Sequence, residues 1–79
     1  MNDLLAVSLG NVIKVHRDAA KMSQERLAQM CGLHRNYMWQ VEQGKYSVSV
    51  KTLASIASAL DVRASTLLSE AEDAISEES

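Results

Sequence analysis

Four side chains between residues 35 and 40 could read the edges of DNA bases. Arg35, Asn36, Trp39 and Gln40 stand at positions i, i+1, i+4 and i+5, so on a helix they share one face near its start. Arginine can donate to guanine O6 and N7, and asparagine or glutamine can pair with adenine N6 and N7. Trp39 could pack on a thymine methyl group or against the neighbouring turn of its own chain, and the sequence leaves both open.

Residue types that support catalysis or metal binding do not gather at a spacing typical of such sites. Cys31 is the only cysteine, and His16 and His34 are isolated from it and from each other, so no disulfide framework or metal set is indicated. We expect Cys31 to be a small core hydrophobe. Without a paired-carboxylate or nucleophile arrangement, we expect no enzyme, no cofactor, no metal and no small-molecule substrate.

Length and composition indicate one small helical domain. The chain has 79 residues, is 47% hydrophobic and contains no proline, which suits a globular helical protein with a compact core. No apolar run approaches the length of a membrane span, and the first nine residues do not read as a signal peptide. We therefore expect no membrane association and a cytoplasmic location.

Charge divides the chain unevenly. The net charge is -2, but all eight Lys and Arg precede residue 64, and five of the ten acidic residues lie among the last ten. Residues 1–69 thus carry +3, which favours a nucleic-acid partner. We predict a DNA-binding domain over residues 1–69 and an acidic tail over residues 70–79.

Apolar periodicity predicts an all-α fold with five helices. Ser23 is a suitable N-cap for the second helix, Gly32 ends it with a left-handed residue, and Ser49 is a suitable N-cap for the fourth. The acidic end of the chain could fray, or it could extend the fifth helix with Ala71 and Ile75 on the apolar side. The predicted helices cover about 4–20, 24–31, 35–42, 50–60, and a stretch starting near residue 64.

The second and third predicted helices have the properties of a helix-turn-helix unit. Ala28 provides the small residue where two helices cross closely, and Gly32 permits the tight turn. Met38 and Val41 share the apolar face of the third helix, which leaves residues 35, 36, 39 and 40 outward. In this motif the N-terminal residues of the second helix of the pair meet base edges in the major groove.

A distributed set of residues between about 9 and 68 resembles the phage-repressor and Cro-like (XRE-type) helix-turn-helix regulators. The resemblance implies a five-helix, lambda-repressor-like DNA-binding domain. Within that family, residues 34–37 followed by Glu42 are similar to the small dimeric controller proteins of restriction-modification systems. The matching residues are Leu9-Gly10, Arg17, Ser23 to Ala28, Cys31 to Leu33, Glu42, Gly44, Thr52-Leu53, Ile56-Ala57 and Ala59-Leu60.

The resemblance also implies roles for individual residues. Arg17 and Glu42 would form a structural ion pair between the first and third helices. Arg35, Asn36, Trp39 and Gln40 would face the bases, and Gln24 would contact a phosphate and brace the recognition helix. The other expected phosphate contacts are His34 at the N-cap of that helix and, in the loop beyond it, Lys45, Tyr46 and Ser47.

These inferences together predict a transcriptional regulator that binds a pseudo-palindromic operator as a homodimer. Leu67, Leu68 and Ala71 are the predicted dimer interface, although one of the two leucines is expected to close the monomer core instead. Double-stranded DNA is the main expected partner, and RNA polymerase could be another. The alternative is an antitoxin or protein-interaction module that uses the same fold and holds a partner through its acidic tail.

Overall fold

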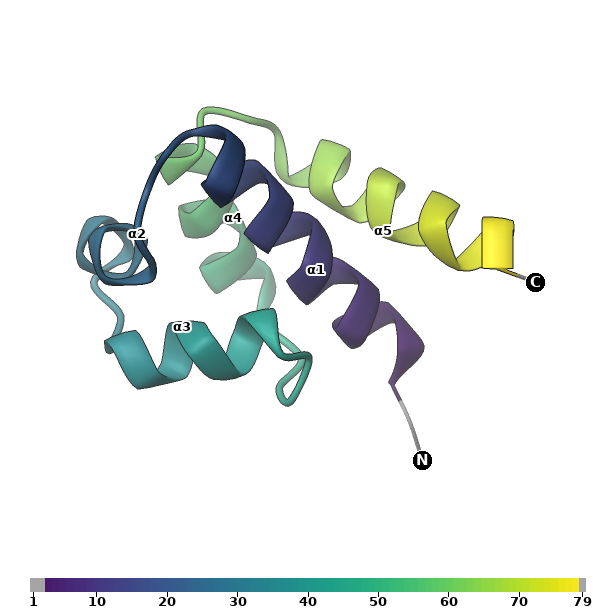
Figure 1. Cartoon of the computed structure of the whole chain (residues 1–79), viewed down its shortest axis with the longest axis horizontal. Coiled ribbons are helices and arrows are strands. Elements are labelled where there is room, and N and C mark those ends of the chain that lie inside the picture. Colours follow the sequence, from purple (N-terminus) through teal and green to yellow (C-terminus); the bar gives the residue numbers. More distant parts are fainter. Residues whose placement is uncertain (1–2, 79) are drawn as a thin grey trace.

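The computed structural model describes residues 3–78, which form five α-helices and contain no strand (Figure 1). The predicted all-α, five-helix architecture is therefore confirmed. None of these helices is both long and apolar enough to span a bilayer. The helices are α1 (Leu4–Ala19), α2 (Gln24–Cys31), α3 (Arg35–Glu42), α4 (Val50–Ala59) and α5 (Ala64–Glu78).

Short polar side chains cap the helices where the sequence predicted caps. The Ser23 hydroxyl accepts a hydrogen bond from the backbone N–H of Arg26, and the Ser49 hydroxyl accepts one from that of Thr52. Gly32 follows α2 in the left-handed conformation, with φ of 68°, where a glycine has no Cβ penalty. Ser23 and Gly32 thus mark the two ends of α2. Only three residues separate α2 from α3, so the end of α2 also limits where α3 can begin.

The core lies between the five helices, with α1 packed against α5 and α3, and α2 packed against α3 and α4. Figure 1 shows α1 between α5 on one side and α3 on the other, with α4 behind it. Helices α1 and α3 cross closely at Gly10, where a Cβ atom would lie 2.3 Å from the carbonyl oxygen of Val41. The Leu9-Gly10 part of the family resemblance thus has a steric reason. The fully buried large side chains are Ile13, Leu27, Met38, Ile56 and Leu67.

Helix α5 runs without interruption past the boundary that we predicted between residues 69 and 70. Ala71 has no exposed surface, and its carbonyl oxygen accepts a hydrogen bond of 2.8 Å from the Ser8 hydroxyl of α1. His16 on α1 also contacts Glu70, with 2.8 Å between Nε2 and Oε1. Of the two alternatives for the acidic end, the structure shows the helical extension, since apolar positions of α5 continue to pack on α1.

Two of the three residues predicted for the dimer interface need correction. Leu67 and Ala71 have 0% of their surface exposed in the single chain, so they have no surface to offer a partner. Both belong to the monomer core because they lie four residues apart on the side of α5 that faces α1. Leu68 is half-buried and keeps some surface available.

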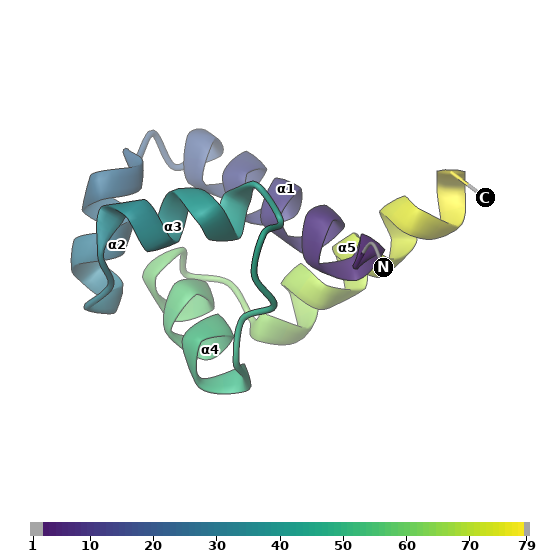
Figure 2. The same ribbon diagram turned by 90° about the horizontal axis from the view of Figure 1, so that it is seen from below.

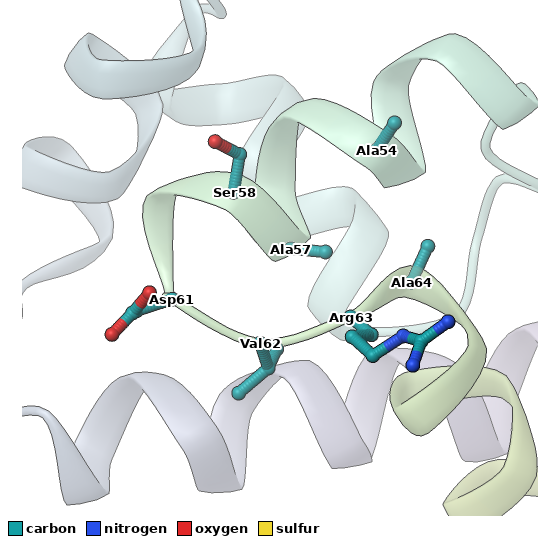
Figure 3. A pocket seen from close by; sticks show the side chains of 7 residues that line it. All are labelled: Ala54, Ala57, Ser58, Asp61, Val62, Arg63 and Ala64. Atoms are coloured by element: carbon teal, nitrogen blue, oxygen red, sulfur yellow. The ribbon is translucent and has the colours of Figure 1, made fainter.

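The loop between α4 and α5 forms one wall of a shallow hollow (Figure 3). Asp61 adopts φ of 59°, the left-handed conformation. Its carboxylate and the Arg63 guanidinium point away from each other. Alanine and serine side chains of α4 form much of the remaining lining. Such a surface offers few converging polar groups to a ligand.

Candidate nucleic-acid interface

The predicted base-reading residues share the outer face of α3. Arg35 and Asn36 are exposed, Trp39 is 44% exposed, and Gln40 is half-buried. Figures 1 and 2 show α3 along one edge of the molecule, with no other helix covering its outer side. The opposite face of α3 is buried through Met38 and Val41, so the helix is held by one face and presents the other.

A buried ion pair anchors the C-terminal end of α3. The guanidinium of Arg17 donates to both carboxylate oxygens of Glu42, with Nε to Oε2 at 2.6 Å and Nη2 to Oε1 at 2.9 Å. Arg17 is 8% exposed and Glu42 is 6% exposed. The structural pair implied by the family resemblance is therefore present, in the bidentate geometry that makes arginine–carboxylate pairs strong.

Neighbouring groups also contact the pair, among them Asp18 Oδ1, which lies 3.3 Å from Arg17 Nη1. Arg17 Nη1 donates to the carbonyl oxygen of Met22 at 2.8 Å, and Gln24 Nε2 donates to Glu42 Oε1 at 2.9 Å. The hydrogen bond from Arg17 to Glu42 raises the pKa of the Arg17 guanidinium, against the opposing effect of burial. One network thus joins α1, the start of α2 and the end of α3.

Gln24 donates a hydrogen bond to Glu42 at the end of α3 and keeps a donor for a second partner. Its side-chain nitrogen carries two hydrogens, and only one of them is used by Glu42. The residue is half-buried at the start of α2. A phosphate oxygen that approaches this helix start would meet the second N–H, and the helix dipole favours negative charge there.

His34 caps the recognition helix with its ring. Nδ1 accepts a hydrogen bond of 3.1 Å from the backbone N–H of Asn36, so the proton of the neutral ring lies on Nε2. The side chain is exposed, and Nε2–H is a donor of the kind that phosphate oxygens accept. The sequence placed His34 at the N-cap but did not reveal that its ring nitrogen takes over the role of a serine or threonine hydroxyl.

The loop after α3 lies against the recognition helix through contacts that sequence reasoning missed. Lys45 Nζ lies 5.0 Å from the centre of the Trp39 ring, and the Tyr46 ring stacks on Tyr37 with 5.8 Å between centroids and 28° between planes. Trp39 thus contacts its own chain, while nearly half of its surface stays exposed. The pattern of apolar and polar residues along the chain does not predict contacts between a loop side chain and an aromatic ring of the preceding helix.

Ser47 has a different partner from the predicted phosphate. Its hydroxyl donates to Asp3 Oδ2 at 2.6 Å, and this hydrogen bond is the main cause of the lowered pKa of the Asp3 carboxyl. The other Asp3 oxygen accepts from the backbone N–H of Ala6 and caps α1. A phosphate contact by Ser47 would have to break this bond beside a carboxylate, so Lys45 and Tyr46 are better placed for that role.

The other chemically versatile residues do not form a site of their own. Cys31 is half-buried against the core, and burial raises the pKa of its thiol, which disfavours the reactive thiolate. Among residues 3–78 no group of three or more His, Cys, Asp or Glu side chains could hold a metal ion. The polar face of α3 and its surroundings are the strongest candidate for function.

Comparison with known proteins identifies the class to which this arrangement belongs. Residues 8–70 match the family model of the helix-turn-helix domain, and the chain belongs to this family of DNA-binding regulators. The predicted XRE-type relationship is thereby confirmed.

The similar proteins include a phage repressor, a control protein and a restriction-modification controller of known structure. The chain is 35% identical over 64 residues to the immunity repressor protein of Bacillus phage phi105, covering 81% of this chain and 44% of the repressor. It is 37% identical over 60 residues to the control protein C.SmaI of Serratia marcescens, covering 76% and 71% of the two chains. The structure of the restriction-modification controller protein C.AhdI from Aeromonas hydrophila superposes with a TM-score of 0.77 at 37% identity, covering 85% and 98%.

Proposed function

We propose that this protein regulates transcription by binding a pseudo-palindromic DNA operator as a homodimer. One observation carries the proposal: α3 presents Arg35, Asn36, Trp39 and Gln40 outward while the opposite face and the C-terminal end of the helix are buried and anchored. Such a helix can enter the major groove without rearranging the domain. Each good bidentate pair with a base contributes about 1–3 kcal/mol of discrimination.

Phosphate contacts would set the position of the recognition helix on the duplex. Gln24 and His34 each have a spare N–H near the starts of α2 and α3, and Lys45 and Tyr46 are exposed beyond the end of α3. Donors at both ends of α3 can contact the backbone on either side of one groove, which fixes orientation but carries little sequence information. The proposed binding requires no cofactor. We also propose that the protein acts in the cytoplasm, where RNA polymerase could be a further partner.

Dimerisation is supported by an apolar groove that includes Leu68. The groove has a volume of about 180 Å³ and also contains Leu5, Val48 and Val50. Val50 is 85% exposed and Leu5 is 39% exposed, and clustered apolar surface of this kind favours association. A two-fold axis through this region would give two recognition helices, which we expect about 34–36 Å apart on the operator.

Charge substitution in the groove tests the dimer. Leu68→Glu should shift the protein to monomer in sedimentation at about 100 µM and weaken operator binding with it, because a carboxylate would be buried in the interface. Val15→Glu is the matched control, since Val15 is 59% exposed on α1 and outside this groove. A wild-type protein that is monomeric with and without DNA would refute the homodimer.

Selection from random DNA tests sequence-specific binding directly. The full chain should enrich duplexes that carry an inverted repeat with half-sites about 10–10.5 base pairs apart, one turn of DNA. The DNA upstream of the gene for this protein should contain such a site. Equal recovery of all sequences would refute the proposed function. Stable co-purification with a second protein, together with equal recovery, would favour the antitoxin or interaction module.

A further inference from the structure

Trp39 and Lys45 form a contact that joins the base-reading face to the loop beyond it. Lys45 Nζ lies 5.0 Å from the centre of the indole ring, within the distance of about 6 Å at which a cation and an aromatic face attract. The two residues are six apart in the chain, and one lies on α3 while the other lies past its end. The lysine therefore folds back over the helix instead of extending into solvent.

The backbone between them makes this fold-back possible. The N–H of Lys45 donates to the carbonyl oxygen of Gln40 at 3.0 Å, and Gly44 adopts φ of 75°, a left-handed conformation suited to glycine. Directly afterwards the Tyr46 ring stacks on Tyr37. Consecutive loop residues thus rest on two different side chains of α3, which restricts the positions open to both.

We propose that Trp39 is a positioning residue for Lys45: the indole face holds the ammonium group at the edge of the recognition surface, where it meets a DNA phosphate. This inference rests on the proposed DNA-binding function and assigns Trp39 a role that acts through the lysine. A long lysine side chain loses rotamer freedom on binding. A lysine already held by the indole loses less, so the pair contributes more than the two residues would separately.

The proposal predicts that substitutions of the two residues are not additive. A random-sequence duplex of about 20 base pairs is the probe, because a phosphate contact needs no operator. Trp39→Leu should weaken binding about 2- to 5-fold in the wild-type background, the range expected for an exposed cation–π contact. In the Lys45→Met background the same change should have almost no effect. Trp39→Phe, which keeps an aromatic face, should retain most of the binding.

Salt dependence separates positioning from direct contact with DNA. Lys45→Met should reduce the slope of log Kd against log salt by about one. Trp39→Leu removes no charge. It should still reduce the slope by more than half of the reduction caused by Lys45→Met, because the displaced ammonium no longer meets its phosphate. A control uses Lys51, an exposed lysine at the start of α4. Lys51→Met and Trp39→Leu should be additive, as expected for independent sites.

Proton NMR of the DNA-free protein tests the contact separately from the function. Trp39 is the only tryptophan, so an upfield ring-current shift of the Lys45 side-chain protons should disappear in Trp39→Leu. Unchanged Lys45 shifts, an unchanged salt slope in Trp39→Leu, or additivity with Lys45→Met would each overturn the inference while leaving DNA binding intact. A wild-type chain without salt-dependent DNA binding would instead refute the proposed function, and the positioning role would fall with it.

Discussion

Glu42 and Arg17 form a buried pair whose disruption should cost this domain a large share of its stability. Glu42 accepts two hydrogen bonds from Arg17 and one from Gln24, and the Glu42 side chain has no exposed surface. Glu42→Leu leaves the buried guanidinium with only the exposed Asp18 carboxylate, 3.3 Å from Arg17 Nη1, so the change should cost about 3 kcal/mol, the lower end of the range for a broken buried pair. A chain of this length has a total unfolding free energy of about 4–12 kcal/mol. The variant should therefore lose at least about a quarter of the stability of the domain, and it should be largely unfolded if the total lies near the lower end of this range.

A double-mutant cycle measures the interaction. Arg17→Met should cost about as much as Glu42→Leu, because it leaves a buried carboxylate. The double variant should lose much less than the sum, about 2 kcal/mol, since two apolar side chains replace two charges. Met22 and Gln24 each lose a hydrogen bond, and the exposed Asp18 loses its contact with Arg17. The assay is urea unfolding followed by circular dichroism at 222 nm.

An exposed pair serves as the control. It adjoins the buried network, since its Asp18 carboxylate also lies 3.3 Å from Arg17 Nη1. Lys14 Nζ and Asp18 Oδ2 are 2.8 Å apart, but their side chains are 50% and 53% exposed. Lys14→Met should cost no more than about 0.5 kcal/mol, as expected for a surface pair four residues apart. The reasoning about the buried network is refuted if Arg17→Met or Glu42→Leu costs less than about 1 kcal/mol, or if the double variant loses the sum of the two.

Three further changes test other features of the structure. Gly10→Ala should destabilise the fold by about 1–3 kcal/mol in urea unfolding and weaken DNA binding. The new methyl would overlap the carbonyl oxygen of Val41 and push α1 away from α3. A neutral effect would contradict the close crossing. Lys21→Gly should raise the unfolding free energy by about 0.5–1 kcal/mol, since Lys21 adopts φ of 58°, a left-handed conformation that glycine adopts without strain. A lower unfolding free energy would show that Lys21 carries no such strain. Glu72→Gln combined with Asp73→Asn changes the net charge from -2 to 0 and should strengthen binding to random DNA at low salt, whereas unchanged affinity in titrations would exclude repulsion by the end of α5.

Local signals in the sequence predicted α2 and α3 closely. Ser23 and Gly32 mark the ends of α2 by side-chain capping and by backbone conformation, and both features depend only on neighbouring residues. The Arg17–Glu42 pair came from the family resemblance, because a spacing of 25 residues along the chain has no periodic signal. The family pattern encodes that long-range contact where local rules do not.

The parts that sequence reasoning missed depend on tertiary packing. Helical periodicity placed Leu67, Leu68 and Ala71 together on α5, but it could not say how much of that face α1 covers. The structure buries Leu67 and Ala71 completely and leaves Leu68 partly exposed. The contact of Trp39 with Lys45 was equally unforeseen, because a loop residue reached back across the end of its own helix.

The central claim is that α3 reads bases while the loop beyond it contacts phosphates, and Arg35 and Lys45 test it most directly. Both are exposed cations, so simple charge loss would affect them alike. The measurement is a set of salt titrations of Arg35→Ala and Lys45→Ala on three duplexes: the selected operator, the operator with one substituted base pair in each half-site, and random DNA.

The two variants should fail in different ways. Arg35→Ala should lose about 1–3 kcal/mol on the operator and relax preference at one base pair in each half-site. Lys45→Ala should weaken binding to all three duplexes alike and reduce the salt slope by about one for each phosphate that the lysine neutralises. If Arg35→Ala lowers affinity equally for all three duplexes and leaves base preference intact, Arg35 does not read bases, and the recognition surface proposed for α3 is contradicted.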